Sequence, residues 1–142
     1  MHSVSARTIE ILEAVEQSTQ HRFQYREEIV QIVELASRSK REEVFEDILF
    51  FSKFIWNSYN VMKRIGTEND GYPKLAEEFR TSIEKMTTLL KTLVKDGPEE
   101  LKENMKIAFF SISHDSMDNL LELSHDLSRM KNYSIDTKQK FF

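Results

Sequence analysis

The 142-residue sequence contains no cysteine, only three glycines and only two prolines. The absence of cysteine excludes disulfide bonds, thiolate metal ligands and a cysteine nucleophile. The glycines and prolines fall in two places: Gly66, Gly71 and Pro73 form one group, and Gly97 and Pro98 form the other. Because β-sheet proteins need frequent tight turns built with these residues, their scarcity predicts a handful of long helices instead.

The chain also lacks an excess of positive charge and a long uncharged apolar run. Its 24 acidic and 20 basic residues are interspersed and give a net charge of −4, which argues against a nucleic-acid-binding surface. The most apolar stretch, residues 44–65, carries five charged residues, too many for a membrane span. The N-terminus has no apolar segment of the kind that a signal peptide needs. These absences predict a cytoplasmic protein whose partners are neither nucleic acid nor membrane.

Apolar residues recur at spacings of three and four, which predicts amphipathic helices. Four are expected, over about residues 4–36, 41–65, 73–96 and 98–131. Pro73 suits a first helical turn, and Gly66 and Gly97 suit helix ends. The corner between the first two helices is expected at Ser37–Lys40, where Ser39 and Glu42 have the spacing of a capping box.

The fold class expected from these helices is all-α, an up-down-up-down four-helix bundle with longer first and fourth helices. Residues 1–132 would form this single domain and residues 133–142 a loose C-terminal tail. The first helix contains a polar stretch, Gln17 to Arg22, without glycine or proline, so one continuous helix is favoured over two. The longer helices would project together from one end of the bundle.

Two sets of apolar residues are candidates for contact with a partner. The projecting helix ends would carry Leu123, Leu127 and Met130, which two helices alone cannot bury. On the second helix, Phe50 and Phe54 lie outside the apolar face that core packing requires. Aromatic residues are enriched in protein interfaces, although such a cluster more often belongs to the core. These residues predict a homo-oligomer or a complex with another protein.

Histidine and acidic residues on the last helix are the candidates for chemistry. His114 and His125 lie eleven residues apart, about three turns, so both project from one face. Asp118 and Glu122 lie along the same line, and antiparallel packing would bring His21 level with His114. Imidazole and carboxylate groups on facing helices are common metal ligands, and Glu122 precedes His125 with the Glu-x-x-His spacing of di-iron sites. These residues form a candidate ligand or metal site, although no particular cofactor is implied.

Two other interpretations of this helix stay open. Its acidic side chains can simply solvate an exposed face, as charged runs on helices most often do. The residues in question are Asp115, Asp118, Glu122 and Asp126. In addition, the segment Phe110–Asp115, in which a histidine precedes an acid, resembles the phospho-accepting segment of histidine-kinase dimerisation helices. Asn119 and Met117 replace that family's proline and arginine. The resemblance implies a phosphate carrier without kinase activity.

Together these patterns predict a non-enzymatic helical-bundle module for protein interaction or structure that self-associates. The alternative function is a metal- or phosphate-carrying histidine site on the fourth helix.

Overall fold

The computed structural model describes residues 4–111 and 114–130, and over these residues all regular elements are helices, without strands. The elements in chain order are α1 (Val4–Thr19), α2 (Arg26–Arg38), α3 (Glu42–Ile65), α4 (Tyr72–Val94), α5 (Glu99–Met105), the π-helical segment η1 (Lys106–Phe110) and α6 (His114–Ser128). The all-α class is therefore confirmed. Within the described residues, no helix is both long enough and apolar enough to cross a membrane.

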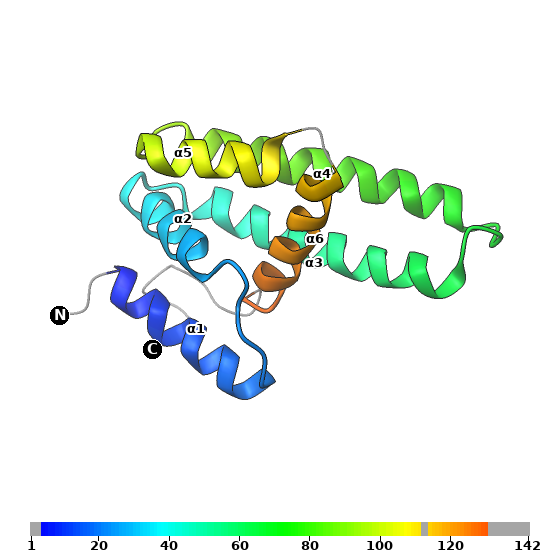
Figure 1. The fold of residues 1–142 in the computed structure, drawn as a ribbon, viewed down its shortest axis with the longest axis horizontal. Coiled ribbons are helices and arrows are strands. Elements are labelled where there is room, and N and C mark those ends of the chain that lie inside the picture. The colour runs from blue at the N-terminus through cyan, green and yellow to red at the C-terminus, as the bar shows by residue number, and fades with distance from the viewer. Residues whose placement is uncertain (1–3, 112–113, 131–142) are drawn as a thin grey trace.

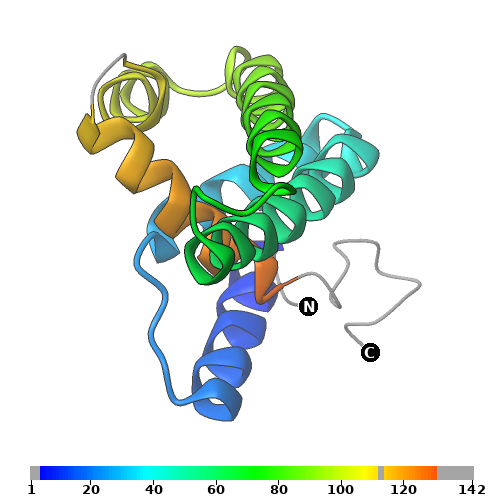
Figure 2. The ribbon, with the colours of Figure 1, turned by 90° about the vertical axis from the view of Figure 1, so that its right-hand side faces the viewer.

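The longest elements, α3 and α4, form an antiparallel hairpin that runs the length of the molecule (Figure 1). α6 packs across α3, and α5 runs back from the end of α4 toward α6 (Figure 1). α1 and α2 pack against each other, and α1 lies on the side of the molecule away from α4 (Figure 2). One continuous core joins these elements; its fully buried members include Leu12, Ile32, Phe45, Ile55, Met86, Leu90 and Leu127.

The predicted second and third helices are confirmed, because strong local signals set their ends. Gly66 ends α3 with a φ of 79°, a left-handed conformation that glycine adopts at little cost. Its N–H donates to the carbonyl oxygen of Met62 at 3.0 Å. Pro73 lies in the first turn of α4, where a helix needs no amide donor.

The corner between α2 and α3 lies at the predicted place, but the predicted capping box is wrong. Ser39 is the C-cap of α2, and its N–H donates to the carbonyl oxygen of Leu35 at 2.9 Å. Lys40 adopts a left-handed φ of 57°, and the N-cap of α3 is Arg41. Because of this left-handed residue, α3 begins two residues later than a capping box at Ser39 requires.

The predicted continuous first helix is also wrong, because the chain breaks after Thr19. Residues 20–25, named here the corner loop, separate α1 from α2, and Gln20 has a left-handed φ of 54°. The N–H of Phe23 donates to Oε2 of Glu16 at 2.9 Å. The break folds α2 back against α1 (Figure 1), so that the apolar stripes of both helices enter one core.

The predicted fourth helix is likewise divided. α5 widens into η1, and the backbone of Ser111 is extended, with φ −84° and ψ 157°. α6 then runs steeply across the direction of α5 (Figure 1). The side-chain amide of Asn119 donates to the carbonyl oxygen of Ala108 at 2.9 Å, which satisfies a backbone group in the π-helical turn.

These two breaks mean that the described residues do not form the predicted up-down-up-down bundle with long first and fourth helices. The structure has six α-helices over the described ranges instead of four. The predicted tail, residues 133–142, lies outside the described residues, and the single domain over residues 1–132 stays a prediction.

Candidate functional site

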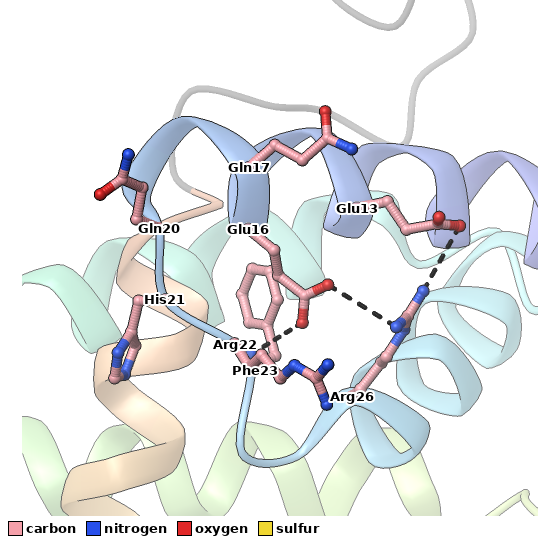
Figure 3. Close-up of a pocket in the computed structure, with 8 residues that line it drawn as sticks. All are labelled: Glu13, Glu16, Gln17, Gln20, His21, Arg22, Phe23 and Arg26. Carbon is pink, nitrogen blue, oxygen red and sulfur yellow. Dashed lines mark hydrogen bonds and ion pairs between the residues drawn. The ribbon is translucent and has the colours of Figure 1, made fainter.

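A pair of histidines lies where the corner loop meets α6. The ring centroids of His21 and His125 are 5.6 Å apart, and their planes are inclined by 41°. Figure 3 shows the side chain of His21 directed toward α6. His125 also stacks on Trp56 of α3, with centroids 4.1 Å apart and 17° between the planes. Burial lowers the pKa of His125, and Arg129 and His21 lower it further, so His125 is neutral at pH 7.

Arg129, which follows the last turn of α6, holds the corner loop in place. Its Nη2 atom donates to Oγ1 of Thr19 at 2.6 Å and to the carbonyl oxygen of His21. Its guanidinium carbon lies 4.2 Å from the ring centroid of Phe23, a cation–π contact. Its Nη1 atom lies 3.8 Å from Oδ1 of Asp126. One arginine therefore joins the end of α1, the loop and α6.

Asp126 is buried, with 2% of its surface exposed. Its Oδ2 atom accepts a hydrogen bond from the N–H of Tyr25 at 2.8 Å, and its carboxyl group accepts another from the N–H of Gln24. Burial raises the pKa of Asp126 to about 6, although these amides and Arg129 act to lower it. Asp126 thus satisfies backbone donors just before α2, where no side chain of the loop does so.

We name Glu16, Asp126 and Arg129 the corner clamp, because these three side chains hold the backbone of the corner loop. Tyr25 adds a further link to α6, since its hydroxyl donates to Oδ1 of Asn119 at 3.0 Å. Burial, followed by nearby acidic groups, raises the pKa of Tyr25 to about 12, so it stays protonated at neutral pH.

A hollow of about 560 Å³ opens between the end of α1 and the corner loop (Figure 3). Its lining residues are Glu13, Glu16, Gln17, Gln20, His21, Arg22, Phe23 and Arg26. Arg26 pairs with Glu13 at 3.4 Å and with Glu16 at 3.6 Å. Both carboxylates of this hollow therefore hold α1 to α2 and the loop, which is a structural role.

The structure brings together two of the five residues predicted for a ligand or metal site. His21 and His125 meet, whereas Asp118 and Glu122 are exposed on α6. The side chain of His114 lies outside the described part of the structure, as do residues 112–113 of the segment that resembles phospho-accepting helices. Among the described residues, no group of three or more His, Asp or Glu side chains is placed to hold one metal ion.

The predicted interface on the last helix is corrected by the structure. Leu123 and Leu127 are 0% exposed and Met130 is 1% exposed, so all three belong to the core of the chain itself. The projecting pair of helix ends does not form, because the break after Thr19 and the turn before α6 return both segments to the body. These side chains are therefore covered without a partner.

The aromatic side chains predicted on the second helix lie at the surface. Phe50 is 55% exposed and Phe54 is half-buried. Phe51, beside them, meets Phe50 edge to face with centroids 5.4 Å apart, and Nζ of Lys85 lies 5.7 Å from its ring centroid. We name Phe50, Phe51 and Phe54 the aromatic stripe.

Two hollows border this stripe between α3 and α4. One, of about 510 Å³, is lined by Phe54, Lys74, Glu77, Glu78, Thr81, Ser82 and Lys85. The other, of about 450 Å³, is lined by Asp47, Phe51, Glu84, Lys85, Thr88 and Leu89. Lys85 belongs to both, so the hollows lie next to each other along α4. The aromatic stripe and the two hollows together are named the α3–α4 face.

Sequence reasoning missed the corner clamp, because Asp126 was interpreted as part of a solvated acidic face. A usable signal was present: Asp126 lies three residues after Leu123 and four before Met130, which places it on the apolar stripe. An acid on such a stripe is buried only when it has partners. Those partners come from the corner loop, which was expected to be helical.

Asp126 leads to a prediction on pH dependence. Because its pKa is raised from 3.8 to about 6, the folded protein binds a proton there before the unfolded chain does. The part of its contribution to stability that comes from protonation is therefore present at low pH and is lost as pH rises through 6. The lowered pKa of His125 acts in the opposite direction between pH 6.5 and its folded value.

The effect of Asp126 on the pH dependence of stability is separated from that of His125 by comparing the wild type with the variant Asp126→Asn, whose side chain does not titrate. Between pH 7 and pH 4.5, the wild type should gain on the order of 2 kcal/mol of unfolding free energy relative to this variant. Urea unfolding of both proteins at both pH values measures this gain. The effect of His125 is the same in the two proteins and therefore cancels in the comparison. Equal changes in the two proteins would show that the carboxyl group of Asp126 has an ordinary pKa.

Comparison of the chain with protein-family models, curated proteins and solved structures finds no match.

Proposed function

We propose that this protein is a non-enzymatic module for protein interaction or structure, and that it self-associates through the α3–α4 face. The observation that carries the proposal is the 55% exposure of Phe50 beside two other phenylalanines. Full burial of a phenylalanine side chain is worth about 1.5–3 kcal/mol. A partner that covers the aromatic stripe is favoured for this reason, and exposed apolar patches commonly mark interaction sites.

The size of this face also supports the proposal. α3 and α4 contain 24 and 23 residues. Two helices of about 35 Å length and 10 Å diameter present about 700 Å² side by side. Standard interfaces bury about 800 Å² on each partner. The α3–α4 face, which spans residues 47–54 of α3 and 74–89 of α4, occupies part of this area, and its two hollows give it relief into which side chains of a partner can insert.

The acidic groups of the corner favour a structural role over catalysis. Glu16 accepts a hydrogen bond from Phe23 and pairs with Arg26, and Asp126 accepts two backbone N–H groups while it faces Arg129. A general acid or base needs a carboxyl group that can reach a substrate. These groups are instead committed to the backbone of the chain.

The alternative, a metal- or phosphate-carrying histidine site, has weaker support. His21 and His125 are close enough to share a ligand, but the guanidinium of Arg129 lies beside them and opposes a metal cation. His125 is also half-buried against Trp56, which limits access for a phosphate donor.

The absence of cysteine and the balanced charge support a cytoplasmic setting for the module.

Replacing both Phe50 and Phe54 with glutamate is expected to abolish self-association. The two carboxylates would be desolvated in the interface, whereas in the single chain they stay near solvent, so folding should be preserved. Light scattering coupled to size-exclusion chromatography at micromolar concentration should show a dimer or larger assembly for the wild type and a monomer for the variant.

Ile107→Glu is the matched control for this experiment. Ile107 is 68% exposed on η1 and lines neither hollow of the α3–α4 face, so its replacement should leave self-association unchanged. The proposal is wrong if the wild type is a strict monomer at micromolar concentration, or if the double variant associates as the wild type does. Circular dichroism confirms that each variant keeps its helical content.

A further inference from the structure

His21 lies between two surroundings of different charge, α6 on one side and the hollow beside the corner loop on the other. Its ring is directed toward α6 (Figure 3), where the centroid of the His125 ring lies 5.6 Å from its own. The same residue lines the hollow of about 560 Å³, which has room for an imidazole ring. Because His21 is exposed, its side chain can turn from α6 to the hollow by rotation about its own bonds.

The surroundings on α6 become positive in acid. Arg129 is charged at every pH of interest, and at pH 7 the carboxylate of Asp126 lies beside it. Histidine gains its charge between about pH 8 and 5, and the pKa of Asp126, about 6, means that this carboxylate loses its charge within the same range. α3 contributes Trp56, which is uncharged. In acid, a charged His21 would therefore face Arg129 and the titrating ring of His125 without the counter-charge of Asp126.

The hollow offers a charged His21 a more balanced environment. Its carboxylates are those of Glu13 and Glu16, and its guanidinium groups are those of Arg22 and Arg26. Arg26 pairs with both carboxylates, at 3.4 Å and 3.6 Å. Two negative and two positive side chains leave no net charge in the hollow. A cation is therefore repelled less there than on α6 in acid.

We propose that His21 is a proton-sensitive switch with two positions: the neutral ring lies against His125, and the charged ring turns away from α6 into the hollow. His125 stays on Trp56 in acid, because the face of an aromatic ring also attracts a charged imidazole, so His21 is the ring that moves. The backbone of the loop stays in place, since the corner clamp holds it. Acid therefore uncovers the ring of His125. This switch is independent of the proposed self-association.

Nuclear magnetic resonance of the full chain measures the position of the ring. At pH 7.5, nuclear Overhauser contacts are expected between the ring protons of His21 and those of His125. At pH 5 these contacts should weaken on the order of tenfold, because like charges repel at this distance. New contacts should join the ring of His21 to the side chain of Gln17, which lines the hollow. The N–H of His21 donates to the carbonyl oxygen of Glu16 at 3.2 Å, and its hydrogen-exchange protection should be the same at both pH values.

His21→Phe tests whether charge moves the ring. Phenylalanine is aromatic but cannot be protonated, so its ring should stay against His125 at pH 5. His114→Gln removes a histidine from the same helix and is the matched control, in which the response of His21 should be unchanged.

The switch is overturned if the wild-type ring contacts are as strong at pH 5 as at pH 7.5, or if His21→Phe loses them as the wild type does. A loss of exchange protection at the N–H of His21 in acid would also overturn it, because the whole loop would then move and not one side chain.

Discussion

Replacing Asp126 with alanine is expected to lower the free energy of unfolding by about 3–5 kcal/mol, the range seen when one member of a buried charge pair is removed. The carboxyl group is 2% exposed, and it accepts hydrogen bonds from the N–H groups of Gln24 and Tyr25. Alanine would leave both donors without this acceptor and would leave the guanidinium of Arg129 without its carboxylate. Urea unfolding at pH 7, followed by circular dichroism, measures the loss.

Two further variants show whether the corner clamp is the cause. Asp126→Asn keeps one oxygen acceptor and should be less destabilising than Asp126→Ala. Asp118→Ala removes an exposed carboxylate from the same helix and should change stability by no more than about 0.5 kcal/mol. If Asp126→Ala behaves like Asp118→Ala, the carboxylate does not hold the corner loop.

Leu127→Ala should lower the free energy of unfolding by about 2–5 kcal/mol, because a leucine that is removed from a packed core leaves a cavity. Leu127 is 0% exposed in the single chain. At a concentration where the variant stays folded, its self-association should match that of the wild type. Urea unfolding and light scattering on the same sample measure the two quantities.

Phe50→Ala provides the contrast with Leu127→Ala. Phe50 is 55% exposed, so its truncation should have little effect on unfolding of the monomer but should weaken self-association. The opposite result, in which Leu127→Ala weakens association at little cost in stability, would restore the interpretation of the last helix as a projecting interface. The pair of variants thus separates core burial from contact with a partner.

The hairpin of α3 and α4 follows from the sequence with little help from the rest of the fold. Gly66 and Pro73 are local signals, and their effects depend on backbone conformations that need no distant partner. Helical periodicity also placed Phe50 outside the apolar stripe of its helix, although burial in the core was favoured over an interface for this aromatic cluster. Periodicity thus indicated Phe50 and Phe54 as interface candidates, whereas the two hollows of the α3–α4 face depend on how α3 packs against α4.

The contact between His21 and His125 could not be predicted from helical periodicity. Antiparallel packing of a continuous helix placed His21 level with His114, about three turns away along α6. The corner loop moves His21 toward the other end of that helix. An error in one backbone break thus changes which side chains meet.

The sequence by itself determined that the protein is helical, where α3 and α4 begin and end, and which aromatic side chains stay outside their core face. Only the tertiary structure decided the break at the corner loop, the π-helical turn before α6 and the burial of Leu123 and Leu127. The reason is that part of the corner loop has its backbone amides satisfied by a group far away in the sequence. Here the N–H of Tyr25 bonds to Asp126, 101 residues further along the chain, and no local pattern reports such a contact.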